Sequence, residues 1–238
     1  MSENEDVFGL ALEDYYNGLL DAHFDVSSQT IDDEQWAVSE FFLAHDQMSP
    51  LTCEALEMCR STTLDIGACG GSHSLWLQSN GILVDALDVS CGACRVMKSR
   101  GLHSVVNSDI FTYETQKRYS TILLLMNGLG IAGSLDNLPR LLRKLSSLLS
   151  PDGKILTDIT DLAYLYEEED GSIALPLSDR YYGQIDYVIK YGRATAQYDW
   201  LFLGYDVLED VATQCGLSLT CLQSESRYTS LVCLSKKK

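Results

Sequence analysis

One stretch of the sequence, residues 63–90 (TLDIGACGGSHSLWLQSNGILVDALDVS), constrains the fold more than any other. It begins with a short apolar segment around Asp65, passes through a turn with three glycines in five residues, and continues with helical apolar spacing as far as Gly81. A second, almost wholly apolar segment follows and ends at Asp88. Strands of this kind occur in parallel sheets that are covered on both faces. We therefore predict a strand–turn–helix–strand unit of such a sheet.

The glycine turn and the acidic residue after the second strand indicate a nucleoside-like ligand. Glycine lets the backbone approach a ligand closely, and free N–H groups at the start of a helix favour an anionic group. A carboxylate about 20 residues further on suits the hydroxyls of a ribose, and Asp88 stands at that place. An ordinary turn without a ligand has the same pattern, so the turn alone leaves both interpretations open. A dinucleotide fingerprint does not fit, because the glycines are Gly67, Gly70 and Gly71.

Strand and helix patterns continue to alternate beyond this unit, which is typical of a doubly wound α/β sheet. Residues 119–126 (YSTILLLM) are the longest apolar run and predict the central strand. Residues 135–149 place leucines on one helical face, and residues 154–159 predict the fifth strand. Residues 217–222 and 229–234 predict a closing hairpin with one antiparallel strand. The expected fold is a mostly parallel seven-stranded sheet with helices on both faces.

Two regions lie outside this alternation. Residues 1–60 have helical apolar spacing and no strand pattern, so we predict an N-terminal helical cap before a domain that spans residues 61–238. Residues 160–205 hold eight of the thirteen tyrosines and predict a β-hairpin inserted after the fifth strand. The candidates for the wall of a substrate pocket in this insertion are Tyr181, Tyr182 and Trp200. Packing of the hairpin onto the sheet is the alternative role of such aromatic side chains.

Charge and apolar content restrict the partners and the location. The net charge of −17 at pH 7 disfavours a nucleic-acid partner, which requires a basic face, and also disfavours an anionic membrane surface. No apolar run approaches the ~20 residues of a membrane-spanning helix. The first residues, MSENEDVF, lack the basic and apolar regions of a signal peptide. We therefore expect a cytoplasmic protein that binds neither nucleic acid nor membrane.

The eight cysteines are most simply free thiols in a reducing compartment. Cys91 and Cys94 have C-x-x-C spacing, but no second ligand pair follows at a spacing that suits zinc. We therefore predict no metal site. A redox role for this pair stays open, although the same residues also fit the start of an ordinary helix.

Several motifs resemble those of the class I S-adenosylmethionine (SAM) dependent methyltransferases. The first motif of that family is an acidic residue followed by G-x-G-x-G. Asp65, Gly67 and Gly71 match it, while Cys69 replaces the middle glycine. Cysteine is small, so we interpret this replacement as tolerable.

Three later features resemble the same family in the same order. Asp109 follows the third predicted strand and Asn127 follows the fourth. The run from Leu142 to Leu156 (LRKLSSLLSPDGKIL) resembles the family's helix, turn and fifth strand. Together with the first motif, the resemblance covers roughly residues 60–160 and 205–235.

The resemblance implies that SAM binds at the carboxyl ends of the strands. Asp88 would accept hydrogen bonds from the ribose hydroxyls, and Asp109 from the adenine amino group. The expected cofactor-binding residues are Asp65, Gly67, Ala68, Cys69, Gly71, His73, Asp88, Val89, Asp109, Ile110, Met126 and Asn127. A general base is needed only if the acceptor arrives protonated. The candidates for that base are His73, Asp158 and Asp161, and the sequence does not choose among them.

The function that the resemblance implies is transfer of a methyl group from SAM to a small molecule, with S-adenosyl-L-homocysteine (SAH) as the other product. Two alternatives remain open. The first is a methyltransferase that acts on protein or RNA, and the second is a non-catalytic SAM-binding or interaction protein. The acceptor atom and the oligomeric state stay unassigned.

Overall fold

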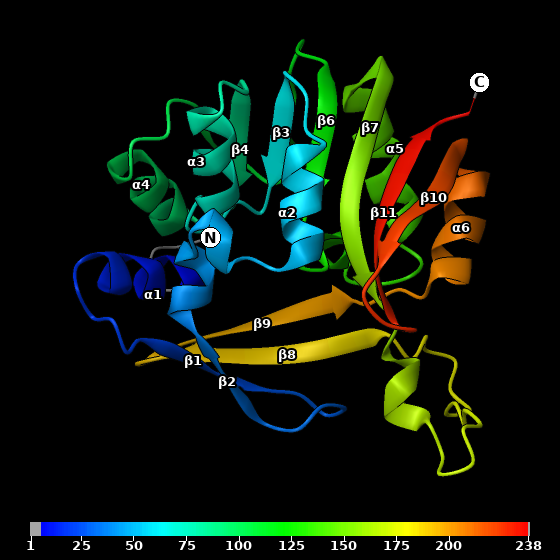
Figure 1. The fold of residues 1–238 in the computed structure, drawn as a ribbon. Helices are drawn as coiled ribbons and strands as arrows, with labels where there is room; N and C mark the ends of the chain where they lie inside the picture. The colour runs from blue at the N-terminus through cyan, green and yellow to red at the C-terminus, as the bar shows by residue number, and fades with distance from the viewer. Residues whose placement is uncertain (1–5, 238) are drawn as a thin grey trace.

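A seven-stranded sheet forms the centre of the molecule in the computed structural model, which describes residues 6–237 (Figure 1). Its strand order is β10-β11-β7-β6-β3-β4-β5. Neighbouring strands from β5 to β7 are parallel, whereas β11 pairs antiparallel with β7 and with β10. The strands are β3 (Thr63–Ile66), β4 (Val84–Asp88), β5 (Val105–Asn107), β6 (Tyr119–Leu124), β7 (Leu149–Thr160), β10 (Leu217–Ser224) and β11 (Thr229–Lys236).

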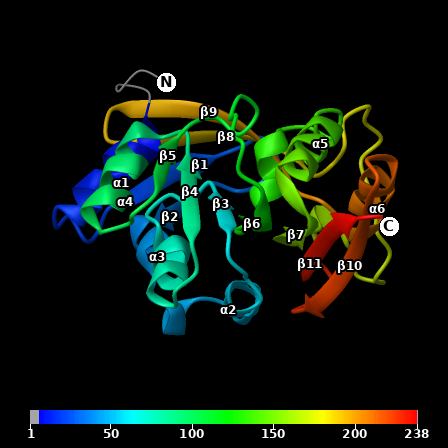
Figure 2. The same cartoon turned by 90° about the horizontal axis from the view of Figure 1, so that it is seen from above.

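Helices cover both faces of this sheet, as the sequence predicts (Figure 2). Ile122 and Leu124 of the central strand pack into the core cluster shared with α5 and α6, and Leu123 packs into the cluster shared with α2 and α3 on the opposite face. This alternation is what a strand buried on both faces requires. The helices over the sheet are α2 (Pro50–Glu57), α3 (Ser72–Ser79), α4 (Cys91–Ser99), α5 (Leu138–Leu148) and α6 (Tyr205–Gln214).

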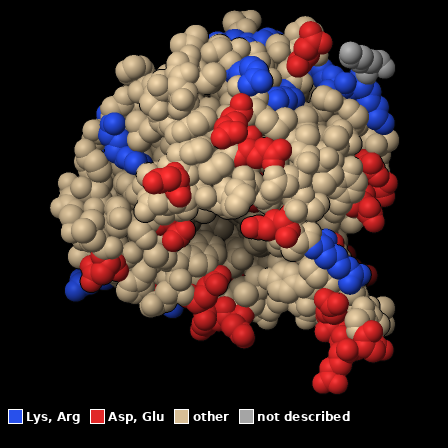
Figure 3. Space-filling model, in the orientation of Figure 1, with Lys and Arg blue, Asp and Glu red and all other residues tan. Residues whose placement is uncertain are grey.

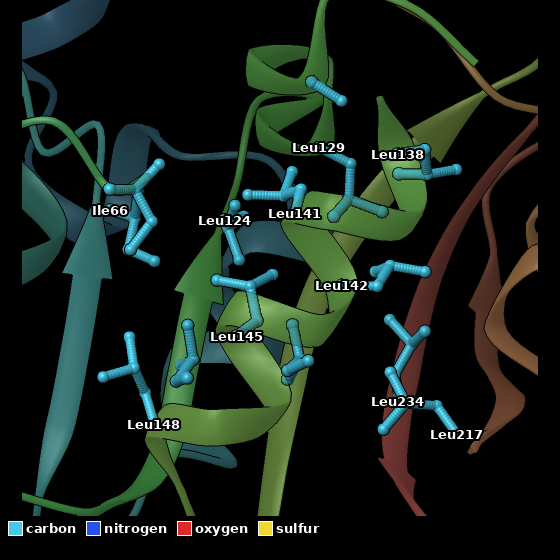
Figure 4. Close-up of a cluster of buried hydrophobic side chains, with 14 of the residues drawn as sticks. Ile66, Leu124, Leu129, Leu138, Leu141, Leu142, Leu145, Leu148, Leu217 and Leu234 are labelled. Atoms are coloured by element: carbon cyan, nitrogen blue, oxygen red, sulfur yellow. The ribbon is translucent and has the colours of Figure 1, made fainter. Parts of the chain in front are cut away.

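Helix α5 shows how strongly one apolar face fixes the position of a helix. Its five buried leucines point toward the sheet, and Figure 4 shows them over Ile66 and Leu124. Burial of a leucine side chain contributes about 1.5–3 kcal/mol, so these residues outweigh any propensity of the helix itself. The leucines are Leu138, Leu141, Leu142, Leu145 and Leu148.

A second, four-stranded antiparallel sheet lies across the carboxyl ends of the parallel strands (Figure 1). We call it the cap sheet. Its order is β2-β1-β8-β9, so a hairpin from the N-terminal region pairs with a hairpin from the insertion after β7. Its strands are β1 (His23–Ser27), β2 (Glu34–Ala37), β8 (Gln184–Tyr191) and β9 (Ala194–Leu201). The inserted hairpin therefore occurs where the alternation of apolar residues predicts it.

The prediction of a wholly helical cap over residues 1–60 is wrong. Helix α1 (Val7–Tyr16) and helix α2 form as expected, but β1 and β2 lie between them. Phe24 and Val26 of β1 are buried, while the residues beside them are exposed or half-buried, and their partner β8 lies far along the chain. Such non-local pairing overrides local helical spacing. The short 3₁₀ segments are η2 (Val38–Phe42), η3 (His45–Gln47), η4 (Gly128–Ala132) and η5 (Leu162–Tyr166).

Candidate active site

A cavity of about 950 Å³ lies between the seven-stranded sheet and the cap sheet. Figure 3 shows a hollow between the upper body and the lower layer of the molecule, with acidic side chains along its border. One part of its wall comes from the segments that follow β3, β4, β5 and β6, and we call this part the cofactor half. The other part, the cap half, comes from the start of α1, the cap sheet with its adjoining segments, η2 and the start of α2.

The structure brings most of the predicted site residues to this cavity. Those that line it are Asp65, Gly67, Ala68, Cys69, His73, Asp88, Val89, Asp109, Ile110, Met126, Asn127 and Trp200. Those that it does not bring to the wall are Gly71, Tyr181, Tyr182, Asp158 and Asp161.

Asp88 lies at the end of β4, buried beneath the glycine turn. Its two carboxylate oxygens accept hydrogen bonds from the backbone N–H groups of Cys69 and Ser90, each at 2.8 Å. Burial raises the pKa of Asp88 to about 6, and the charges of Asp6 and Asp65 add to the shift. A carboxylate has about four acceptor sites, so this side chain can accept two further hydrogen bonds from a ligand.

Cys69 adopts the left-handed backbone conformation that a glycine would favour, with φ of 48°. Its N–H donates to Asp88, and this bond holds the turn in place without glycine at this position. Burial, followed by the charge of Asp88, raises the pKa of the Cys69 thiol, which keeps the thiol neutral. The departure from the family motif is therefore compatible with the same turn geometry.

The three glycines of the turn lie next to different neighbouring residues. Gly67 has φ of 72°, and a Cβ there would meet only Ile131, at 3.7 Å. A Cβ on Gly70 would lie 2.2 Å from the carbonyl oxygen of Phe41, so Gly70 allows η2 to pack on the turn. A Cβ on Gly71 would lie 2.8 Å from a side-chain carbon of Leu102. Of these glycines, only Gly67 lines the cavity.

Asp65 and His73 form a polar corner of the cofactor half. The Ser74 hydroxyl donates to Asp65 at 2.7 Å, and burial raises the pKa of Asp65 while the charge of His73 opposes that shift. The His73 side chain is half-buried on the cavity wall and makes no hydrogen bond to a described residue. Its ring nitrogens are therefore free to contact a ligand.

The turn after β6 is strained and has buried oxygen atoms without donors. Met126 and Asn127 have φ values of 59° and 54°, and the Asn127 N–H donates to Asp158 at 2.9 Å. The side-chain oxygen of Asn127 and the other carboxylate oxygen of Asp158 are buried and have no hydrogen-bond partner within residues 6–237. Burial raises the pKa of Asp158. Of these two residues, only Asn127 lines the cavity, so its side-chain oxygen is the one that a ligand with a donor could reach.

Asp109 and its neighbours form the far end of the cofactor half. Asp109 accepts a hydrogen bond from the N–H of Phe111 at 2.8 Å, which fixes the turn after β5. Ile110 is buried and Val89 is exposed at the cavity. Asp109, Ile110 and Val89 all line the cavity.

Tyr181, Tyr182 and Asp161 form a packing cluster at the foot of the inserted hairpin. The Tyr182 hydroxyl donates to Asp161 at 2.7 Å, and the Tyr181 and Tyr182 ring centroids are 4.5 Å apart. Asp161 also accepts a hydrogen bond from the N–H of Ala163 at 2.9 Å, which caps η5. These side chains attach the hairpin to the end of β7 and do not form the pocket wall that the sequence analysis expected.

Sequence reasoning missed most of the cap half. Its seven lining aromatic residues are Phe8, Trp36, Phe41, Tyr187, Tyr198, Trp200 and Phe202, and the sequence predicts only Trp200 among them. The alternation of apolar residues along β8 and β9 was the available signal for those on the hairpin. No local pattern places β2 beside them.

Asp6, which sequence reasoning also missed, joins the cap to the cofactor half. It accepts hydrogen bonds from the N–H of Gly9 in α1 and from the N–H of Gly92 in α4, each at 2.9 Å. Ser90 donates to the same carboxylate at 3.0 Å. A Cβ on Gly92 would lie 2.4 Å from the Cα of Gly9, so the two helices cross with their backbones in contact.

No group of His, Cys, Asp or Glu side chains among residues 6–237 is arranged to hold a metal ion. The Cys91 thiol donates to Asn107 at 3.2 Å, and Cys94 is buried within α4. Within the same part of the chain, no helix is both long and apolar enough to cross a membrane.

This fold and this cavity define the class of the protein: an α/β protein that binds a nucleoside-containing ligand at the carboxyl edge of its sheet. A SAM-dependent methyltransferase from Bacteroides fragilis, solved with SAH, is 35% identical to the chain. Its TM-score is 0.92, and the match covers 99% of this chain and 97% of that one. The chain therefore belongs to the class I SAM-dependent methyltransferases, and its cofactor is SAM.

More distant structures share the fold. The CcbJ methyltransferase from Streptomyces caelestis is 16% identical, with a TM-score of 0.62 and coverage of 97% of this chain and 98% of that one. An amino pentose methyltransferase from Micromonospora echinaspora, solved with SAM, is 11% identical, with a TM-score of 0.56 and coverage of 87% and 100%. The chain matches no family model and no curated protein sequence.

Proposed function

We propose that this methyltransferase transfers the methyl group of SAM to a small molecule. The observation that carries the proposal is the cap sheet, which covers the carboxyl edge and leaves a cavity of about 950 Å³ with walls on both sides. This volume lies at the upper end of the range for small-molecule sites, so it suits a cofactor and a second small ligand together. Such a cap leaves little room for the body of a macromolecular substrate beside the cofactor.

We assign the cofactor half as follows. Asp88 accepts hydrogen bonds from the ribose hydroxyls, and its position between two backbone donors orients its free lone pairs. Asp109 accepts from the adenine amino group, with Ile110 against the ring. Asn127 and His73 hold the methionine portion or the group beside it. When bound, SAM supplies an electrophilic methyl group on a sulfonium, and the residues supply orientation.

Two further observations support a small acceptor. The net charge of −17 at pH 7 opposes binding of RNA to an extended surface. In addition, two structures that share the fold are named as a sugar N-methyltransferase and an amino pentose methyltransferase.

The experiment that tests the proposal has two stages. Calorimetric titration with SAM, SAH and NAD checks the cofactor, and we expect binding of the first two and none of NAD. The protein is then incubated with methyl-tritiated SAM and a cell extract separated by size into a small-molecule fraction, a protein fraction and an RNA fraction. Label in the small-molecule fraction is the expected result, with the Asp88→Ala variant as the control.

Two outcomes would overturn the proposal. Label that enters only protein or RNA would establish the macromolecular alternative. Binding of SAM without label in any fraction would favour a non-catalytic SAM-binding protein.

A further inference from the structure

The cap half of the cavity has a chemistry of its own. Its seven aromatic side chains come from α1, β2, η2, β8 and β9, and from the segment that follows β9. Trp36 and Tyr187 meet edge to face, with ring centroids 5.2 Å apart. Gly130 lets the indole of Trp200 approach, because a Cβ there would lie 2.0 Å from its ring nitrogen. These rings are therefore held in place by neighbouring residues before any ligand enters.

The charges around the cavity have one dominant sign. Five carboxylate residues line it, whereas no Lys or Arg is among its described lining residues. Acidic side chains also border the hollow in Figure 3. An anionic acceptor would meet like charges on this wall, and a cationic one would meet opposite charges. The carboxylate residues are Asp6, Glu40, Asp65, Asp88 and Asp109.

Four of these five carboxylates accept hydrogen bonds from the protein, and Glu40 does not. Asp6, Asp65, Asp88 and Asp109 bind backbone N–H or hydroxyl donors within the chain. Glu40 lies in η2, which belongs to the cap half, and makes no hydrogen bond or ion pair with a described residue. Glu40 is exposed at the border of the cavity, so its charge is available to a ligand that enters there.

We propose that the methyl acceptor is a small organic amine, which the cap half binds as an ammonium ion through Glu40 and the aromatic rings. This inference rests on the proposed small-molecule function and narrows it to one acceptor class. An ammonium over the faces of Trp and Tyr rings is attracted by their quadrupoles, and the attraction increases when water is excluded. A carboxylate at the rim adds a charge-assisted hydrogen bond.

The chemistry of transfer agrees with this acceptor. The ammonium first loses one proton, and His73 is the imidazole among the described lining residues that can accept it. The nitrogen lone pair then forms a bond to the methyl carbon as the carbon–sulfur bond breaks, and the electron pair of that bond stays on the sulfur of SAH. The positive charge moves from sulfur to nitrogen, so the acidic wall faces a cation before and after the transfer.

The test uses three acceptors that share a skeleton and differ in the group at its end: phenethylamine, 2-phenylethanol and 3-phenylpropanoate. Mass spectrometry measures SAH and the methylated product formed by the full chain. We expect methylation of the amine at least about tenfold faster than of the alcohol, and none of the carboxylate. Preferential methylation of the alcohol or of the carboxylate would overturn the inference.

A binding measurement decides the case in which none of the three is methylated. Calorimetry with the SAH complex compares the ammonium ion with the matched alcohol, and we expect about tenfold tighter binding of the ammonium. Glu40→Gln should weaken ammonium binding about threefold to tenfold and leave alcohol binding unchanged. Glu57→Gln, on an exposed position of α2 away from the cavity, is the matched control.

The outcomes separate this inference from the proposed function. If SAH binds but the alcohol binds as tightly as the ammonium, the amine inference fails and the small-molecule function stands. An equal effect of Glu40→Gln and Glu57→Gln would also overturn the role of Glu40. If neither SAM nor SAH binds, the proposed function itself fails.

Discussion

The two halves of the cavity differ in how the chain assembles them. The cofactor half comes from consecutive segments after β3, β4, β5 and β6, whereas the cap half combines residues before position 53 with residues 187–202. The cofactor half holds three of the five lining carboxylate residues, and buried carboxylates such as Asp88 hold its turns by accepting backbone hydrogen bonds. Aromatic side chains dominate the cap half. The difference agrees with our proposal that the first part binds the cofactor and the second part binds the acceptor.

The contact between the halves depends on very close packing. Gly70 approaches the carbonyl oxygen of Phe41 in η2, and Gly92 approaches the backbone of Gly9 in α1. Asp6 adds hydrogen bonds to both helices at the second contact. The cap is therefore fixed to the cofactor half by backbone contacts that no larger residue permits, and changes at these contacts should have the largest effects.

The largest expected effect is that of Gly92→Val. The new side chain would begin 2.4 Å from the Cα of Gly9, and because this neighbour is backbone, α1 must move. Overpacking of this kind costs typically about 1–3 kcal/mol, and we expect a loss near the upper end in the free energy of unfolding measured with urea. Lys98→Val, on the exposed side of the same helix, is the matched control. Equal stability of the two variants would refute the backbone contact between α1 and α4.

The next prediction compares how one substitution in each half of the cavity affects SAM binding. Asp88→Ala removes the acceptor that we assign to the ribose, and we expect SAM to bind more weakly by about 1–3 kcal/mol in calorimetry. Trp36→Ala, in the cap half, should change SAM affinity by less than about twofold, because we assign its ring to the acceptor side of the cavity. Unchanged SAM affinity in Asp88→Ala would count against the cofactor assignment. A large loss in Trp36→Ala would show that the cap also binds SAM.

A smaller effect comes from the raised pKa of Asp88, which should change stability and SAM affinity in opposite directions as the pH rises. This pKa is raised from 3.8 to about 6 by burial in the folded protein without ligand. The stability contributed by Asp88 is therefore fully present below its unfolded pKa and is lost as the pH rises through about 6. SAM affinity should instead rise over the same range, by at most about tenfold per pH unit, because the ribose hydroxyls favour the carboxylate form.

Calorimetry and thermal unfolding between about pH 4 and pH 7 measure both trends. Asp88→Asn cannot titrate, so its SAM affinity should stay flat across this window apart from any background change. If that variant retained the pH dependence of the natural protein, another group would have to be its source.

The cofactor half was predictable because its signals are local. The order Asp65, glycine turn, helix and Asp88 lies within one short stretch, and the cavity wall contains most of the residues that the stretch predicted. Gly71 is an exception, since it packs against Leu102 and Met97, away from the cavity. A sequence motif reports that a glycine is needed but does not report which neighbour requires it.

The cap half was less predictable because its pairing is non-local. The helical cap predicted over residues 1–60 contains no strand, because Phe24 and Val26 of β1 alternate over too few residues to form a recognisable strand pattern. Its partner β8 lies more than a hundred residues away, and only the folded chain brings Trp36 beside Tyr187. The tyrosine-rich insertion does contribute aromatic residues to the cavity wall, but the sequence does not indicate which tyrosines these are.

The smallest expected effect, that of Tyr182→Phe, tests this last distinction. The hydroxyl of Tyr182 donates to Asp161 away from the cavity, so its loss should lower the free energy of unfolding by about 1 kcal/mol. The KM for the acceptor should not change, because no lining atom is altered. Trp200→Phe, on the wall in the same hairpin, should raise that KM severalfold and leave SAM affinity intact. If Tyr182→Phe raised the acceptor KM as much as Trp200→Phe, the foot of the hairpin would belong to the pocket, as the sequence predicts. A hydrogen bond that only packs the hairpin, away from the acceptor, should change stability without changing the acceptor KM.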